Sequence, residues 1–243
     1  DNNPKAKIRP EDGLLEMRKY LGLYANIRPV KVYESLLSSS PLKASVLRNT
    51  DFIVFRELTG GIYFGEKGLD EKKSSAFDTC RYTKEEIERI SHLAFKEAKK
   101  RKNILTLVDK ANVLETSRLW REVVQNMSND YNDVKVQYLF VDNAAMKIIT
   151  NPSDFDVILT ENMFGDIITD EASVITGSLG MLPSASIGDE ISLFEPIHGS
   201  YPQAAGKNIA NPMAMILSSS MMLDLAFGLK KYSKIINQAV SDA

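Results

Sequence analysis

The chain has 243 residues, of which 44% are hydrophobic and 26% are charged, and its formal net charge at pH 7 is -2. This is the composition of a globular protein, long enough for one large domain or two modest ones. The weak charge excludes a basic surface for nucleic acid or an anionic membrane, and no apolar run reaches the roughly 18 residues that a membrane span needs. Cys80 is the only cysteine, which excludes an intrachain disulfide and predicts a reducing, cytoplasmic location.

Helix and strand patterns alternate from the start of the chain. Leucines at helical spacing predict a helix over residues 13–23, and an extended segment follows. Residues 51–56 (DFIVFR) predict a strand, and the glycine-rich, aromatic residues 58–82 predict a hairpin arm. A charged amphipathic helix is predicted over 83–101, introduced by Thr83 as its N-cap.

Three similar strand–helix units come next. Strands are predicted at 103–108, 134–140 and 155–159, and each leads into a helix, at 115–126, 142–150 and 163–176. This alternation predicts an α/β fold whose strands are at least partly parallel. The last third is predicted to be rich in loops, with a buried apolar helix from 214 to 229.

Polar residues follow the predicted strands at the points where these end. They are Asp109, Lys110, Asp142, Glu161 and Asn162. Because ligands of open α/β sheets bind at the carboxyl ends of the strands, we expect a functional site at this edge.

The segment TENMFGDIITDE (160–171) places two aspartates, Asp166 and Asp170, four residues apart on one helix face, where like charges repel. The apolar residues Ile167 and Ile168 are expected to anchor this helix. A solvated acidic face is the simpler interpretation of the pair. A divalent metal site is the alternative, because Mg²⁺ and Mn²⁺ prefer carboxylate oxygens, and Asp142 at another strand end is a further candidate ligand.

Three arginines lie in unusual local sequences: Arg18, Arg28 and Arg56. Each alone is most simply a surface residue, but converging guanidinium groups would indicate a polycarboxylate ligand. Tyr63 and Lys110 add a candidate acid and a candidate base.

The segment EPIHGSYPQAAGKNIANP (195–212) is either a ligand-binding loop or a plain surface loop. No G-x-G-x-x-G follows a strand and no P-loop motif occurs, so a conventional dinucleotide or P-loop site is unsupported. H-E-x-x-H and G-x-S-x-G are also missing, which argues against a zinc protease or a serine hydrolase.

Several segments together resemble the β-decarboxylating dehydrogenase family, which includes isopropylmalate, isocitrate, homoisocitrate and tartrate dehydrogenases. The segments are RPEDGLLEMRK, LYANIRPVKVY, FRELTGGIYFGE, LVDKANVLETSRLWRE, NMFGDIITDEAS, GSLGMLPSAS and EPIHGSYPQAAGKNIANP. They run along essentially the whole chain, and the GLL of the first resembles the isopropylmalate branch.

The resemblance implies a two-domain α/β fold of the isopropylmalate/isocitrate dehydrogenase type, with a mixed, largely parallel sheet. Residues 1–23 plus 176–243 would form part of a first, cofactor-side domain. Residues 24–175 would form the second domain, with dimerisation helices and an intersubunit arm at about 58–82. The resemblance also implies that the chain is a piece of a longer protein, truncated at both ends.

The resemblance implies a role for each candidate residue. The substrate carboxylates would be bound by Arg18, Arg28 and Arg56. The isopropyl pocket would be lined by Leu14, Leu15 and Val113, with Glu11 nearby. Mg²⁺ or Mn²⁺ would be held by Asp166 and Asp170, joined by Asp142 of the partner subunit. Lys110, also contributed across a homodimer with shared active sites, would be the general base, and Tyr63 the proton donor.

The implied cofactor is NAD, bound by the loop residues His198, Gly199, Ser200, Gln203, Asn208 and Asn211. Gln203 stands where the family usually has an aspartate, which accepts the ribose hydroxyls and repels a 2′-phosphate. Glutamine lacks that repulsion, so NADP is the alternative.

The resemblance therefore implies NAD-dependent oxidative decarboxylation of (2R,3S)-3-isopropylmalate, a 2-hydroxy dicarboxylate, to 4-methyl-2-oxopentanoate in leucine biosynthesis. The alternatives are a tartrate, homoisocitrate or isocitrate dehydrogenase, or a non-catalytic regulatory subunit. Such subunits lose metal or base residues, whereas Lys110, Tyr63 and the aspartates are present here.

Overall fold

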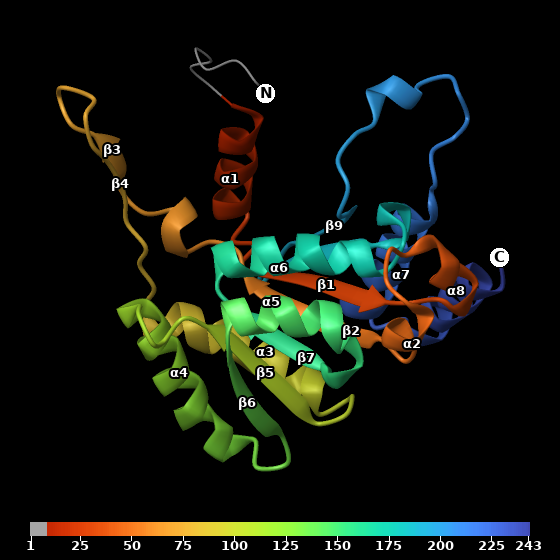
Figure 1. The fold of residues 1–243 in the computed structure, drawn as a ribbon, viewed down its shortest axis with the longest axis horizontal. Coiled ribbons are helices and arrows are strands. Elements are labelled where there is room, and N and C mark those ends of the chain that lie inside the picture. Colours follow the sequence, from red (N-terminus) through yellow and green to blue (C-terminus); the bar gives the residue numbers. More distant parts are fainter. Residues whose placement is uncertain (1–8) are drawn as a thin grey trace.

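A mixed seven-stranded sheet runs through the described part of the chain, residues 9–243 of a computed structural model (Figure 1). Residues 1–8, which belong to the predicted first domain, lie outside the described residues. The strands are β1 (Ala25–Lys31), β2 (Asp51–Glu57), β5 (Ile104–Asp109), β6 (Lys135–Phe140), β7 (Val157–Thr160), β8 (Pro183–Ile187) and β9 (Ser192–Pro196). Their order across the sheet is β6-β5-β7-β2-β1-β8-β9.

Four neighbouring strands, β6, β5, β7 and β2, are parallel, and β1, β8 and β9 continue the sheet in antiparallel pairs. The carboxyl ends of parallel strands lie at a common edge of the sheet. The polar residues that follow the predicted strands, such as Lys110 and Asn162, are therefore expected at this edge. The predicted α/β fold with a mixed, largely parallel sheet is confirmed.

Residues 9–243 form eight α-helices, several of which cover the two faces of the sheet, whereas α1 projects away from it (Figure 1). They are α1 (Pro10–Tyr20), α2 (Ala44–Leu47), α3 (Lys84–Ala98), α4 (Glu115–Met127), α5 (Val141–Thr150), α6 (Asn162–Ile175), α7 (Met213–Leu225) and α8 (Lys230–Asp242). The shorter 3₁₀ turns are η1 (Glu34–Ser39), η2 (Gly61–Tyr63), η3 (Ser128–Asp130), η4 (Pro152–Asp154), η5 (Leu179–Met181) and η6 (Pro202–Ala204). Among residues 9–243, no helix has the length and apolarity to cross a membrane.

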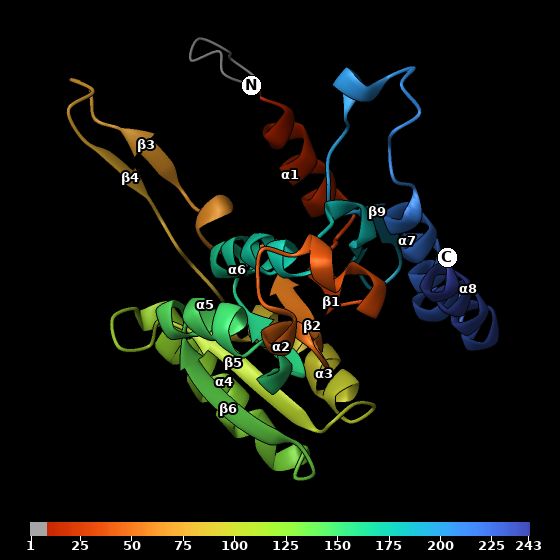
Figure 2. The same cartoon turned by 45° about the vertical axis from the view of Figure 1, so that its right-hand side comes forward.

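Alternation along the strands builds two apolar cores. Val157 and Leu159 of β7 point to the side covered by α3 and α4, where they pack in one cluster with Trp120. Ile158 points to the side covered by α5 and α6, in a cluster with Ile148. Successive side chains of a strand face opposite sides, so a strand covered on both faces is apolar throughout. Figure 2 shows these two helical layers on either side of the sheet.

A two-stranded hairpin extends away from the sheet, with strands β3 (Lys67–Leu69) and β4 (Ala76–Asp78). It confirms the hairpin arm predicted for 58–82. The apolar residues Leu69 and Phe77 are exposed on it. The arm, α1 and the segment 197–212 project from the same side of the molecule (Figures 1 and 2).

The last third contains elements that the sequence did not predict. β8 (PSASI) and β9 (SLFEP) are short and rich in serine and proline, so their pattern is that of a loop. The helix expected from 214 to 229 is also wrong in extent. It ends at Leu225, Gly228 then adopts a φ of 65°, and α8 begins at Lys230.

Hydrogen bonding continues across the predicted domain boundary, because β8 pairs with β1 over Ala25–Ile27. The first and second predicted domains thus share one sheet in this chain. Their division into 1–23 plus 176–243 and 24–175 stays a prediction.

Candidate active site

A cavity of about 360 Å³ lies between α1, the sheet and the start of α6. Its lining residues are Glu11, Leu14, Leu15, Arg18, Arg28, Arg56, Tyr63 and Asp166. All of them were singled out from the sequence as site residues. α1 supplies the leucines and Arg18, β1 and β2 supply the other arginines, and α6 supplies Asp166. The structure therefore brings three arginines, two leucines, a tyrosine and an aspartate around one space.

The arginines of the strands face the aspartates of α6. Arg28 Nη1 donates to Asp170 Oδ1 at 3.3 Å, and its Nη2 lies 4.0 Å from Asp166 Oδ1. Arg56 Nη1 donates to the same Asp166 oxygen. Both guanidinium groups are buried, where a charge needs a partner. The arginines thus offset the repulsion between the two aspartates, in addition to the solvent or metal ion that the sequence suggested.

The positive charges of the three arginines repel one another. Burial, and secondarily the charge of Arg56, lowers the pKa of Arg28 to about 10. Burial and then Arg56 also lower the pKa of Arg18. Asp166 and Asp170 act in the opposite direction on the pKa of Arg28. A carboxylate placed among the three guanidinium groups would likewise reduce their mutual repulsion.

Tyr63 stands over Asp166, and its hydroxyl donates to Asp166 Oδ2 at 3.0 Å. Burial, followed by the Asp166 charge, raises the pKa of Tyr63 to about 12. The tyrosine therefore keeps its proton at neutral pH. Its 3₁₀ turn is set by Gly61, which has a φ of 76° and lies so close to Tyr82 that a Cβ would come within 2.2 Å of the Tyr82 hydroxyl.

Glu161 starts the aspartate helix α6, because its carboxylate accepts from the backbone N–H of Phe164 at 2.7 Å. Ile168 is buried, as expected. The expectation for Ile167 is wrong: its side chain is 57% exposed, as is that of Val174. These two residues are seven positions apart, about two helical turns, so they share the outward face.

Lys110 and Asp142 form a second polar pair at the same edge of the sheet, with Lys110 Nζ 2.6 Å from Asp142 Oδ1. This hydrogen bond lowers the pKa of Asp142. Within residues 9–243, no group of three or more histidine, cysteine or acidic side chains lies close enough to hold a metal ion. One chain therefore does not bring Asp142 to Asp166 and Asp170, and the sharing of these residues between subunits stays a prediction.

Val113 follows Lys110 in the loop after β5 and is 61% exposed. It does not line the cavity of its own chain. Its predicted contact with the substrate would have to be made, like that of Lys110, across a dimer.

The predicted cofactor loop lines a separate cavity of about 440 Å³. Its lining residues are Leu179, Gly180, His198, Gly199, Ser200, Tyr201, Ile209, Ala210 and Asn211. Four of the six predicted cofactor residues are among them. Gln203, in η6, and Asn208 are exposed and do not line it. The cavity is lined by glycines, whose backbone groups a ligand can approach closely, and by apolar side chains. This combination is common in sites for small molecules and cofactors.

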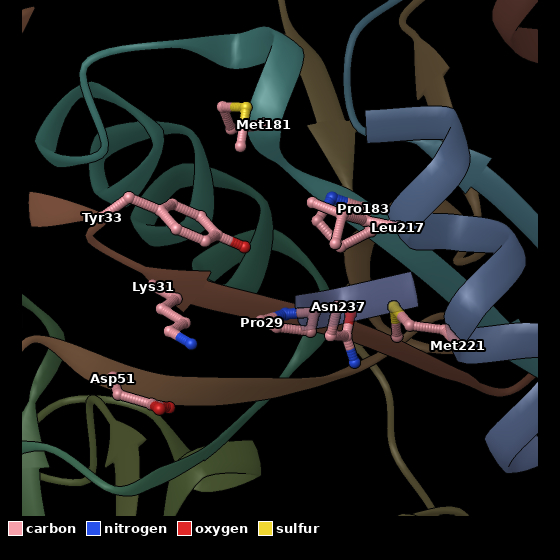
Figure 3. Close-up of a pocket in the computed structure, with 9 residues that line it drawn as sticks. All are labelled: Pro29, Lys31, Tyr33, Asp51, Met181, Pro183, Leu217, Met221 and Asn237. Atoms are coloured by element: carbon pink, nitrogen blue, oxygen red, sulfur yellow. The ribbon is translucent and has the colours of Figure 1, made fainter. Parts of the chain in front are cut away.

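A third cavity, of about 200 Å³, lies between β1 and the pair α7 and α8 (Figure 3). Tyr33, Lys31 and Asp51 line one side of it, and Leu217 and Asn237 line the other. It contains none of the predicted site residues and has no convergent set of charged groups.

Two residues near the arginines were missed by the sequence analysis. Arg28 donates Nε to Asn26 Oδ1 at 2.7 Å and Nη1 to Thr169 Oγ1 at 2.6 Å. Asn26 could have been found from strand alternation, because it lies two residues before Arg28 and so on the same face. Thr169 carried no such signal.

The family model described as isocitrate/isopropylmalate dehydrogenase matches residues 2–243. The 3-isopropylmalate dehydrogenase of Bacteroides fragilis is 57% identical over 240 residues, covering 99% of this chain and 67% of that protein. That of Oceanobacillus iheyensis is 58% identical over 243 residues, covering 100% of this chain and 66% of that protein. The chain thus spans about two thirds of the length of these curated relatives.

Among solved structures, isocitrate dehydrogenase from Methylococcus capsulatus superposes with a TM-score of 0.87 at 34% identity, covering 100% of this chain and 70% of that one. Sequence and fold agree along the whole chain, and the residues that the resemblance singled out lie around one cavity. The chain belongs to the isocitrate/isopropylmalate dehydrogenase family of oxidoreductases.

Proposed function

We propose that the complete protein catalyses the NAD-dependent oxidative decarboxylation of 3-isopropylmalate to 4-methyl-2-oxopentanoate, a step of leucine biosynthesis. The observation that carries the proposal is the composition of the 360 Å³ cavity, where Leu14 and Leu15 face the arginines. The curated relatives named above are 3-isopropylmalate dehydrogenases, which agrees with it.

The cavity suits a dicarboxylate with one branched apolar group. The guanidinium groups bind carboxylates, and the leucines offer apolar surface worth about 0.8 kcal/mol per buried methylene of the substrate. An isocitrate-like substrate would turn a third carboxylate towards those leucines. A charge buried there without a partner is strongly unfavourable, so the leucines select against it.

Asp166 and Asp170 fit a divalent cation. They offer carboxylate oxygens from one face of α6, Asp166 borders the cavity, and the Asp170 side chain is largely exposed. Such hard donors suit Mg²⁺ or Mn²⁺, with Asp142 of the partner subunit completing the set. The bound cation would supply positive charge that acidifies the substrate hydroxyl and stabilises negative charge on the oxygen after decarboxylation.

The proton steps fall to Lys110 and Tyr63. Lys110, with Nζ as the unprotonated amine, would accept the proton of the substrate hydroxyl, and NAD, when bound, would supply the acceptor for the hydride from C2. Carbon dioxide then departs from the β-keto acid, leaving its bonding electrons on the substrate. Tyr63 donates its phenolic proton to the resulting carbanionic carbon, which its retained proton at neutral pH allows.

The 440 Å³ cavity at His198–Ser200 and Asn211 is proposed to take NAD. Gln203 stands in place of an aspartate that would repel a 2′-phosphate, so discrimination against NADP is expected to be weaker than in relatives that carry the aspartate.

A homodimer with shared sites is proposed from the outward apolar face of α5 and α6. Its members, Met146, Ile149, Ile167 and Val174, are all exposed in one chain. An apolar face of this kind beside Lys110 and Asp142 suits a second copy of the chain. We place the protein in the cytoplasm, because Cys80 is unpaired among the described residues and the relatives are biosynthetic enzymes of bacteria.

Formation of NADH tests the function. The complete protein, with Mg²⁺ or Mn²⁺, is assayed separately with isopropylmalate, isocitrate, homoisocitrate and tartrate. We expect the highest kcat/KM with isopropylmalate and loss of activity on chelation. A preference for isocitrate would overturn the substrate assignment, and inactivity with all four would favour a regulatory subunit.

A further inference from the structure

Two buried asparagines lie behind the substrate arginines. Arg28 donates Nε to Asn26 Oδ1 at 2.7 Å. Arg56 donates Nε and Nη2 to Asn162 Oδ1, at 3.1 and 2.9 Å. Neither asparagine lines the 360 Å³ cavity, so neither is placed to touch a substrate. Each acts on the cavity only through its arginine.

Binding at Nε fixes the plane of a guanidinium group, whose donors form a rigid fork. With that edge held, the remaining donors point towards α6: Nη1 of Arg56 reaches Asp166, and Nη1 of Arg28 reaches Asp170. An asparagine oxygen is a neutral acceptor, so it orients the cation without cancelling its charge. An aspartate there would compete with the substrate carboxylate for the same arginine.

The asparagines are themselves fixed, and to different parts of the molecule. Asn26 Nδ2 donates to Ser184 Oγ at 2.9 Å and to the Ala185 carbonyl at 3.2 Å, both in β8. Asn162 Nδ2 donates to the Gly60 carbonyl at 3.0 Å. Asn26 therefore links Arg28 to a neighbouring strand.

Asn162 has a second connection that Asn26 lacks. Gly60 immediately precedes η2, the turn that carries Tyr63. The backbone N–H of Asn162 also donates to the Tyr82 hydroxyl at 3.0 Å, and the Tyr82 ring packs on Gly60 and Gly61. One buried amide thus joins Arg56 to the segment that presents the proton donor.

We propose that Asn26 and Asn162 are positioning residues, each of which orients one substrate arginine through its Nε, and that Asn162 also positions Tyr63. The inference rests on the proposed function. It separates the two residues by role: Asn26 serves substrate binding alone, whereas Asn162 serves binding and the delivery of the Tyr63 proton.

The test measures kcat and KM for isopropylmalate in the complete protein. Loss of one hydrogen bond to a charged group corresponds to about tenfold in binding or rate. Asn26→Ala should raise KM about tenfold and change kcat far less. Asn162→Ala should raise KM about tenfold and also lower kcat about tenfold. Asn126→Ala, a change on the exposed face of α4, is the matched control and should alter neither.

A Tyr63→Phe background distinguishes positioning from a general structural effect. In that background Asn162→Ala should still raise KM but should no longer lower kcat, because the Tyr63 hydroxyl that Asn162 positions is absent. If kcat falls by the same factor in both backgrounds, Asn162 does not act through Tyr63. An unchanged KM in Asn26→Ala would overturn its half of the inference.

If Asn162→Ala does not fold, Asn162→Asp replaces it. This variant keeps an acceptor for Arg56, but its new charge competes with the substrate carboxylate and should raise KM. It loses the donor for Gly60, so kcat should fall only when Tyr63 is present, and an equal fall in the Tyr63→Phe background would overturn the role of Asn162. If the wild-type protein does not oxidise isopropylmalate, the proposed function fails, and crystal structures of the variants decide the inference. Displaced guanidinium groups and a broken Tyr63–Asp166 hydrogen bond support it, and unmoved side chains overturn it.

Discussion

Tyr63 is held neutral by its surroundings. It is partly buried, and its hydroxyl donates a hydrogen bond to the Asp166 carboxylate, so ionisation would place two negative charges 3.0 Å apart. Because its pKa is raised, the Tyr63 hydroxyl stays protonated, and so able to donate its proton, over the whole physiological pH range.

Tyr63→Phe should lower kcat about 100-fold or more, since general acids contribute about that much to rate.

Tyr63→Phe should also change how the free energy of unfolding depends on pH. The pKa of Tyr63 is raised to about 12 in the fold, so its stabilising contribution is present at lower pH and is lost as the pH rises towards that value. Urea unfolding between neutral and strongly alkaline pH should show a smaller alkaline loss for the phenylalanine variant, and equal losses would contradict the assignment.

Asp170 is the more exposed of the two aspartates and makes one ion pair, to Arg28. Asp170→Asn should raise the Mg²⁺ concentration for half-maximal activity by about tenfold or more, because a carboxylate ligand becomes a neutral amide. Circular dichroism should show an unchanged helix content. Asp154→Asn, at an exposed residue away from the cavity, serves as the control. If Asp170→Asn leaves the magnesium titration unchanged, Asp166 and Asp170 form a solvated acidic face and not a metal site.

At the scale of elements, the residues that could be placed from the sequence are those whose patterns are local. α4, with Glu115–Met127, and α6, with Asn162–Ile175, match their predicted helices to within a residue or so at each end, because apolar periodicity is a local signal. β8 and β9 were missed because PSASI is stabilised by its neighbours and not by its own propensity.

The site shows the same division. Arg28, Arg56 and the aspartates were recognised from their motifs, whereas Thr169 was not, because its hydrogen bond to Arg28 joins residues far apart in the chain. The exposure of Ile167 was mispredicted for a related reason. An apolar residue on a helix is equally suited to a core and to an interface, and only the packing of α6 distinguishes them.

Two glycines in functional elements should respond oppositely to alanine. Gly61→Ala should destabilise the protein by about 1–3 kcal/mol, because its φ is 76° and the new Cβ would collide with Tyr82. Gly13→Ala, in α1 with nothing near the new Cβ, should stabilise it by about 0.5–1 kcal/mol through the higher helix propensity of alanine. Chemical denaturation of both variants checks the pair. Equal effects would contradict the geometry of η2.

At the scale of the whole molecule, the residues of the proposed mechanism divide into two sets. Arg28, Arg56, Tyr63 and Asp166 surround the cavity, whereas Lys110 and Asp142 pair with each other elsewhere on the sheet edge. A site built from both sets needs two chains, which the proposed homodimer supplies.

Complementation tests this sharing. Lys110→Ala and Asp166→Ala chains should each be inactive, but co-refolded they should regain about a quarter of wild-type activity, because half of the dimers are mixed and each has one intact site. Lys110→Ala mixed with Asp142→Ala should regain none, since these residues lie 2.6 Å apart in one chain and so serve the same site. Recovery in the second mixture would contradict the arrangement.

The ion pairs at the cavity have a thermodynamic consequence. Arg18, Arg28 and Arg56 are matched in number by Glu11, Asp166 and Asp170, so the charged residues around the cavity sum to zero before any ligand arrives. A dicarboxylate alone would bring two unbalanced negative charges, and a divalent cation alone would bring two positive ones. Only together do they preserve neutrality in a partly desolvated space. The two ligands should therefore bind synergistically, and by linkage each must tighten the other by the same factor.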